Sequence, residues 1–131
     1  MEDVQSVLHQ FLRAFSTFKL EDMMSFFSDD ATAFFPVEHQ PLRLVGKEAI
    51  REAFSLVLAK MRASGATRIR LDAEDIFVQP FDDTSIVTFH IRDAGLSRRT
   101  FVLRRVQGHW RVEHMHASNA PPRTRLPEAR P

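Results

Sequence analysis

The chain has 131 residues and a formal net charge of +1 at pH 7, and 44% of its residues are hydrophobic. This length predicts one domain with a single core, and the near-neutral charge gives no reason to expect general attraction to nucleic acid or anionic membranes. The absence of cysteine and tyrosine excludes disulfides, thiolate metal sites and a tyrosine acid, whereas twelve phenylalanines favour an apolar cavity wall.

Three helices are predicted in the first half of the chain. Apolar residues at spacings of three and four predict an amphipathic helix over residues 3–18. A shorter helix is predicted over residues 21–27, and a third begins after Gly46 and ends near Gly65. Between these two helices, the apolar run at residues 31–35 predicts a first strand, which the following proline ends.

The second half changes to the alternating period of strands. Short turn-like joins separate four predicted strands, at residues 68–79, 84–93, 97–106 and 109–118. Helices followed by such a meander imply an α+β domain over residues 1–119, in which the three N-terminal helices cover one face of a curved sheet. Residues 120–131 have no periodicity and are predicted to form a flexible C-terminal tail.

The last predicted strand carries two histidines on one face. Alternation places His114 and His116 together with Trp110 on one side, and Met115 and Ala117 on the other. Two imidazoles fall short of the three or four ligands that zinc needs, and alternation places the nearest further candidates on the opposite face. We therefore predict no metal and no other cofactor, and we expect both histidines to lie at an oligomer interface.

Three stretches resemble one known superfamily over residues 4–122. They are Thr32–Pro36 with Leu44–Gly46, then Ile91-Arg92, and finally Gly108–Trp110 with His114–Ser118. They resemble the nuclear-transport-factor-2-like superfamily, in particular its SnoaL-like bacterial members and the association (hub) domain of calcium/calmodulin-dependent protein kinase II. The resemblance implies a cone of curved antiparallel or mixed sheet and three helices, a pocket at its open end, and homo-oligomers built on the outer sheet face.

The resemblance also implies where a ligand would bind. In the hub domain, arginines of the last three strands bind small carboxylates. By position, Arg92 retains the first arginine, whereas Phe101 and Ala117 replace the other two, and Ile50 replaces a pocket histidine. The ligand of the hub is therefore not carried over, but Arg99 lies two residues before Phe101 on the same face and supplies a second charge.

The assignment of sheet faces follows from Arg92. If Arg92 points into the cone, His90 does so too, and the outer face carries an apolar stripe that favours a dimer, made of Val87, Phe89 and Ile91. The reference pKa of histidine is about 6.5, so His90 is the candidate acid or base.

The predicted function is a SnoaL-like small-molecule-binding domain, homodimeric or larger, whose apolar pocket recognises an anionic or polar group. The predicted ligand-binding residues are Arg92, His90, Arg99, Phe35, Phe54, Phe101, Met115, Ala117 and the loop residue His39. Two alternatives stay open: a cofactor-free isomerase, dehydratase or cyclase that uses His90, and an oligomerisation scaffold. The start of the chain lacks a secretory signal and no apolar run is long enough to span a bilayer, so a cytoplasmic location without membrane or nucleic-acid partners is expected.

Overall fold

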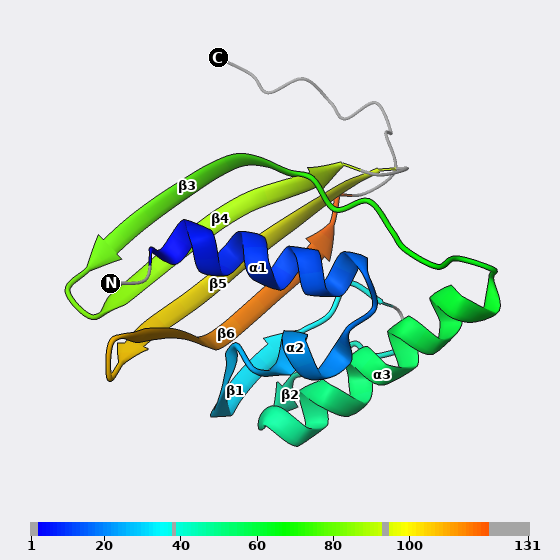
Figure 1. Ribbon diagram of the computed structural model, residues 1–131, viewed down its shortest axis with the longest axis horizontal. Helices are drawn as coiled ribbons and strands as arrows, with labels where there is room; N and C mark the ends of the chain where they lie inside the picture. Colours follow the sequence, from blue (N-terminus) through cyan, green and yellow to red (C-terminus); the bar gives the residue numbers. More distant parts are fainter. Residues whose placement is uncertain (1–2, 38, 93–94, 121–131) are drawn as a thin grey trace, which may run out of the picture.

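The computed structural model describes residues 3–37, 39–92 and 95–120. Three helices lie against one face of a curved six-stranded sheet, so the predicted α+β class is confirmed (Figure 1). The elements are α1 (Val4–Ser16), α2 (Leu20–Met24), β1 (Phe27–Phe34), β2 (Leu44–Val45), α3 (Lys47–Ala63), β3 (Ala73–Phe81), β4 (Thr84–Arg92), β5 (Leu96–Val106) and β6 (His109–Asn119). Within these residues, no helix is long and apolar enough to cross a membrane.

The sheet order is β2-β1-β6-β5-β4-β3, and every pairing is antiparallel except that of β1 with β6. Strand β1 begins earlier than predicted, because Phe27 also pairs with β6, where it lies opposite Val112. Strand β3 begins later than predicted, at Ala73, so the preceding residues form a connection that runs back across the open end of the sheet. The short strand β2 was not predicted.

The narrow end of the cone is filled by aromatic rings. Phe11 on α1 makes edge-to-face contacts with five other phenylalanines at centroid distances of 5.4 to 6.3 Å, namely Phe15, Phe26, Phe27, Phe54 and Phe101. Such edge-to-face pairs contribute about 0.5–1.5 kcal/mol each beyond the area that they bury. The cluster therefore joins α1 and α3 to both β1 and β5.

The inner and outer faces of β4 are the reverse of those predicted. Val87, Phe89 and Ile91 are at most 2% exposed and belong to the core, so they form no outer stripe. His90 and Arg92 consequently lie on the outer face, as alternation requires. The physical reason is the burial of three large apolar side chains, which outweighs any placement of one arginine inside the cone.

Strand β6 contains a β-bulge that changes its alternation. His114 pairs with Val102 and Val112 pairs with Leu103, so Glu113 is an extra residue. As a result Val112 and Met115 both point into the core, and the prediction that Trp110 shares a face with the histidines is wrong. The predicted inner position of Met115 and the outer position of His114 agree with the structure.

One buried polar group in the core has no partner. The hydroxyl of Ser85 on the inner face of β4 makes no hydrogen bond with any described residue, and the residue is 1% exposed. A buried hydroxyl without a partner costs about 1–3 kcal/mol of desolvation. We therefore expect Ser85→Ala to raise the free energy of unfolding by about 0.5–1 kcal/mol, as measured by urea denaturation.

The matched control is Thr88→Ala on the opposite face of the same strand. Thr88 is half-buried, and its truncation is expected to change the unfolding free energy by no more than about 0.5 kcal/mol. If Ser85→Ala lowers the free energy of unfolding by as much as Thr88→Ala or by more, the Ser85 hydroxyl is not unpaired and the prediction is wrong.

Candidate functional site

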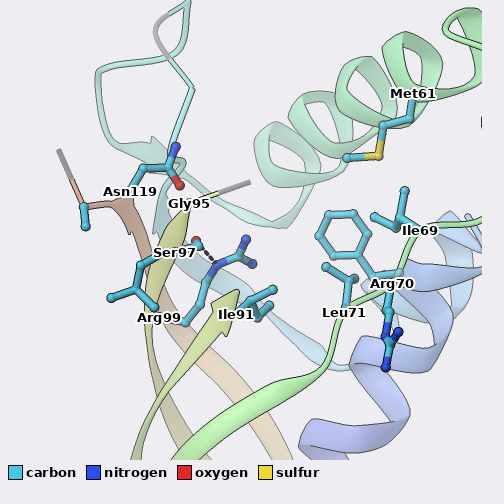
Figure 2. A pocket seen from close by; sticks show the side chains of 12 residues that line it. Met61, Ile69, Arg70, Leu71, Ile91, Gly95, Ser97, Arg99 and Asn119 are labelled. Atoms are coloured by element: carbon cyan, nitrogen blue, oxygen red, sulfur yellow. Dashed lines mark hydrogen bonds between the residues drawn. The ribbon is translucent and has the colours of Figure 1, made fainter. Parts of the chain in front are cut away.

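The open end of the cone contains a cavity of about 800 Å³ (Figure 2). It lies between the start of β5, the last turns of α3 and the connection that leads into β3. The lining residues are Phe15, Met61, Ile69, Arg70, Leu71, Ile91, Gly95, Leu96, Ser97, Arg99, Asn119 and Ala120. This volume lies within the range of about 300–1,000 Å³ that is usual for small-molecule sites.

Backbone hydrogen bonds hold the rim of the cavity in place. The amide of Ile69 donates to the carbonyl of Ser16 at 2.9 Å, which ties the connection to the end of α1. On the opposite side, the amide of Ala120 donates to Leu96 O at 2.7 Å, and Asn119 Nδ2 donates to Pro36 O at 3.1 Å. Both walls are therefore fixed before any ligand binds.

The two walls differ in polarity (Figure 2). Ser97, Arg99 and Asn119 come from the strand ends and form the polar wall, whereas Met61, Ile69 and Leu71 lie across from them. Phe15 is a further apolar lining residue. A cavity with apolar surface and a few convergent polar groups is typical of a ligand site.

Arg99 is the distinctive residue of the cavity. It lies on the inner side of β5 opposite Phe89 and Ala117, and its Nε donates to Ser97 Oγ at 3.0 Å. Burial lowers the pKa of Arg99 to about 10, so the guanidinium stays charged at neutral pH. Among the described residues, no carboxylate forms a salt bridge with it.

The cavity has no side chain suited to proton transfer among the residues that the structure describes. Its described lining contains no histidine, carboxylate or lysine. Arg70 lies at the rim, where its side chain is 89% exposed and forms an ion pair with Asp72. The arrangement can therefore orient a ligand through Arg99, Ser97 and Asn119, but it offers no ordinary general acid or base.

Two predicted site residues do not reach the cavity. His90 pairs with Glu74 of β3 and Arg98 of β5 on the outer side of the sheet. Arg92 is 63% exposed, and its Nε donates to Glu74 Oε1 at 3.1 Å. The prediction that these residues point into the cone is thus wrong, and His39, which is exposed in a loop, is not among the lining residues either.

Most of the predicted apolar wall lies deeper than the cavity. Phe35 and Phe54 stack at a centroid distance of 4.6 Å, and Phe101 and Met115 are buried as neighbours on β5 and β6. Ala117 is buried next to Arg99 in the sheet register. Of the nine predicted ligand-binding residues, only Arg99 is found among those that line the cavity.

Sequence reasoning did not identify several lining residues. Ile69 and Leu71 were assigned to a strand, although their alternation with Arg68 and Arg70 did indicate that one side of this segment is buried. Met61 lies in the predicted third helix and was not among the predicted binding residues. No pattern in the sequence indicated Asn119 as a lining residue, because its place at the cavity depends on where the last strand ends.

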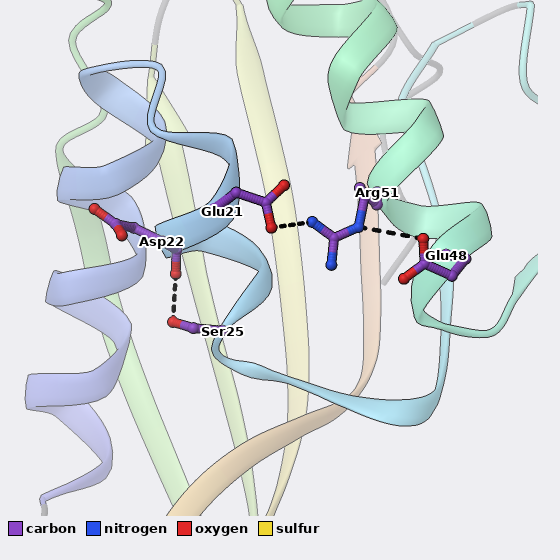
Figure 3. Close-up of polar contacts among 5 residues, drawn as sticks. All are labelled: Glu21, Asp22, Ser25, Glu48 and Arg51. Carbon is purple, nitrogen blue, oxygen red and sulfur yellow. Dashed lines mark hydrogen bonds and ion pairs between the residues drawn. The ribbon is translucent and has the colours of Figure 1, made fainter.

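A second polar cluster lies outside the cavity and joins two helices (Figure 3). Arg51 of α3 donates a hydrogen bond to Glu21 of α2, and the Nε of Arg51 lies 3.3 Å from Glu48 Oε2. The hydrogen bond to Glu21, followed by the charges of both carboxylates, raises the pKa of Arg51. Since both carboxylates are exposed and already paired, this cluster connects the five-residue α2 to α3 and presents no binding site.

The histidines of β6 lie on the outer face beside β1. His114 Nδ1 and Thr32 Oγ1 are 2.7 Å apart, and the rings of His114 and His116 lie 6.1 and 5.2 Å from that of Phe34. Burial lowers the pKa of His114, with smaller contributions from His116 and Arg43. The described residues contain no group of three histidine or carboxylate side chains able to hold a metal ion.

This environment predicts a pH dependence of stability. Because the pKa of His114 is lower in the folded state than the usual 6.5, the unfolded chain binds more protons as the pH falls through that range. The stability that neutral His114 contributes is present above about pH 6.5 and is lost below it. We expect His114→Gln to reduce the loss of unfolding free energy between about pH 7.5 and pH 5, measured by urea denaturation.

His39→Gln is the control for this measurement, since His39 is an exposed loop residue. The control is expected to keep the pH dependence of the original protein. Equal slopes for the His114 variant and the original protein would show that His114 does not carry this effect.

Solved structures identify the class of fold. An NTF2-like protein of unknown function from Pseudomonas putida has a TM-score of 0.78 at 19% identity, with 88% of this chain and 82% of that chain covered. A candidate dehydratase of the NTF2-like family from Streptomyces avermitilis has a TM-score of 0.75 at 19% identity, with 89% and 94% covered. A candidate calcium/calmodulin-dependent protein kinase type II association domain from Thiobacillus denitrificans has a TM-score of 0.73 at 22% identity, with 92% and 97% covered. The fold is therefore NTF2-like.

The sequence assigns the family within this class. Residues 4–122 match the SnoaL-like domain family, and the chain belongs to it. The predicted membership is thus confirmed. None of the curated proteins matches the sequence.

Proposed function

We propose that this SnoaL-like domain binds a small molecule in the cavity at the open end of the cone, with Arg99 as the group that recognises it. The observation that carries the proposal is a partly buried guanidinium that faces a cavity of about 800 Å³ without a described carboxylate partner. An uncompensated buried charge costs folding free energy. A ligand with a negative or strongly accepting group would offset that cost.

Binding is favoured over catalysis by the same lining. The enzyme alternative depended on His90 as acid or base, and His90 is on the outer face of β4. The described cavity wall contributes one guanidinium, one hydroxyl and one amide close together, which can bind and orient a ligand. One solved relative is named as a dehydratase, and that name applies to the relative alone. The described cavity lining of this chain has no group suited to proton transfer.

A mixed library of anionic and neutral small molecules tests binding. We expect at least one compound to raise the melting temperature, and Leu71→Trp, which fills the cavity, to weaken its binding by at least about tenfold in calorimetry. Leu56→Trp is the control, because Leu56 is 54% exposed on α3 and does not line the cavity. The proposal fails if no compound binds, or if Leu71→Trp and Leu56→Trp bind it equally well.

We also propose that a second copy of this chain covers the outer face of the sheet. Side chains there form two cross-strand rows, Ile86, Val102, His114 and Thr32 in one, and Phe77, Thr88, Thr100, His116 and Phe34 in the other. Phe77 is 59% exposed and Phe81 on the same edge strand is 56% exposed. A solved relative named as an association domain supports self-association as the use of this face. The oligomer and the cytoplasmic location remain predictions.

A substitution that places a charged side chain in the centre of these rows tests whether this face forms a dimer. We expect the original protein to have the mass of a dimer in light scattering after size exclusion, and Val102→Glu to be monomeric, because a carboxylate cannot be buried there without a partner. Leu56→Glu on the helical side should leave the mass unchanged. A monomeric original protein at every concentration would exclude this proposal.

A further inference from the structure

We propose that the ligand of the cavity is an amphipathic monoanion, with one carboxylate bound by Arg99 and an apolar chain against the facing wall. This inference rests on the small-molecule binding proposed above and adds the chemical class. The chemical class follows from the charge of the cavity, from the hydrogen-bond donors of Arg99 that have no described acceptor, and from the separation of the polar and apolar walls.

The single unpaired cation among the described lining residues predicts a ligand with one negative charge. Arg99 is the one unpaired cation in the described lining, while Arg70 at the rim is exposed and has Asp72 as its partner. A monoanion therefore pairs the charge of Arg99 fully. A dianion would bring a second negative charge into a partly enclosed site with no further unpaired cation, at a large desolvation cost.

The free donors of Arg99 suit a planar head group. Its Nε is used by Ser97 Oγ at 3.0 Å, whereas the two terminal nitrogens have no described acceptor. Two parallel N–H donors match the two oxygens of a carboxylate in a bidentate pair. A phosphate monoester carries about 1.5–2 negative charges at neutral pH and fits this single cation less well.

The rest of the ligand faces an apolar wall. The side chains of Met61 from α3 and of Ile69 and Leu71 from the connection lie across the space from Arg99. Phe15 of α1 is a further apolar lining residue. This wall has no polar side chain, so a second polar end on the ligand would lose its hydration without gaining a partner. Met61 adds a flexible side chain that can adjust to chains of different shape.

Four compounds of one chain length separate these contributions: octanoate, octanol, octylamine and the dicarboxylate suberate. We expect octanoate to bind with one equivalent per chain in calorimetry, and the other three at least about tenfold more weakly, because octanol is uncharged, octylamine carries a positive charge and suberate adds a second charged end. Arg99→Leu should remove the preference for octanoate over octanol. It should also raise the melting temperature of the unliganded protein, since an unpaired buried charge is removed.

Arg92→Leu is the matched control, since it removes an arginine from the outer face, and it should leave the order of the four compounds unchanged. If Arg99→Leu does not fold, Arg99→Lys keeps the charge and should retain the preference for octanoate with weaker binding. Binding of suberate or octanol as tight as that of octanoate would overturn the monoanion class while small-molecule binding stands. Failure of all four compounds would overturn the monoanion class, and the mixed library would then decide small-molecule binding separately.

Discussion

The edge-to-face packing around Phe11 is the interaction on which the rest of this structure depends. The ring of Phe11 contacts Phe54 of α3, Phe27 of β1 and Phe101 of β5, so one side chain holds together both layers of the domain. Phenylalanine has no polar group that needs a partner, and the narrow end of the cone can therefore close completely. The space that remains lies at the other end, which is why the cavity opens beside the last turns of α3.

Arg99 lies where this packed region meets the cavity. Its neighbours in the sheet, Phe89 and Ala117, are both buried, and its own burial opposes its charge. Such a residue does not stabilise the core, so the fold alone does not account for its presence. The domain tolerates the folding free energy that this burial costs, because the aromatic cluster around Phe11 stabilises the rest of the core.

Much of the fold could be predicted from the sequence, whereas most of the site could not. The period of three to four in α1 and α3 and the alternation in β4 to β6 follow directly from which side chains are buried, and the resemblance carried the same order of elements. The faces of β4 were assigned wrongly because Arg92 was placed inside by analogy. The alternating Val87, Phe89 and Ile91 were the stronger indication of the inner face, since three apolar side chains gain more from burial than one arginine. The cavity was hard to predict because the connection at Ile69 contributes to it through tertiary contacts alone.

The bulge at Glu113 has a consequence for how relatives of this chain should be compared. Ser28 Oγ donates to Glu113 Oε2 at 2.7 Å and Arg104 Nε donates to Oε1 at 3.1 Å, so the extra residue is held at the surface by two neighbouring strands. Without this residue Val112 and His114 would be adjacent in plain alternation, so His114 would stay on the outer face and Met115 in the core. A relative that lacks the bulge therefore has one residue fewer between these two positions and the same order of polar and apolar side chains beyond them. An alignment that places no gap at Glu113 for such a relative would match residues on opposite sides of the sheet, so residues beyond this point should be matched by the side of the sheet that they occupy rather than by their count along the chain.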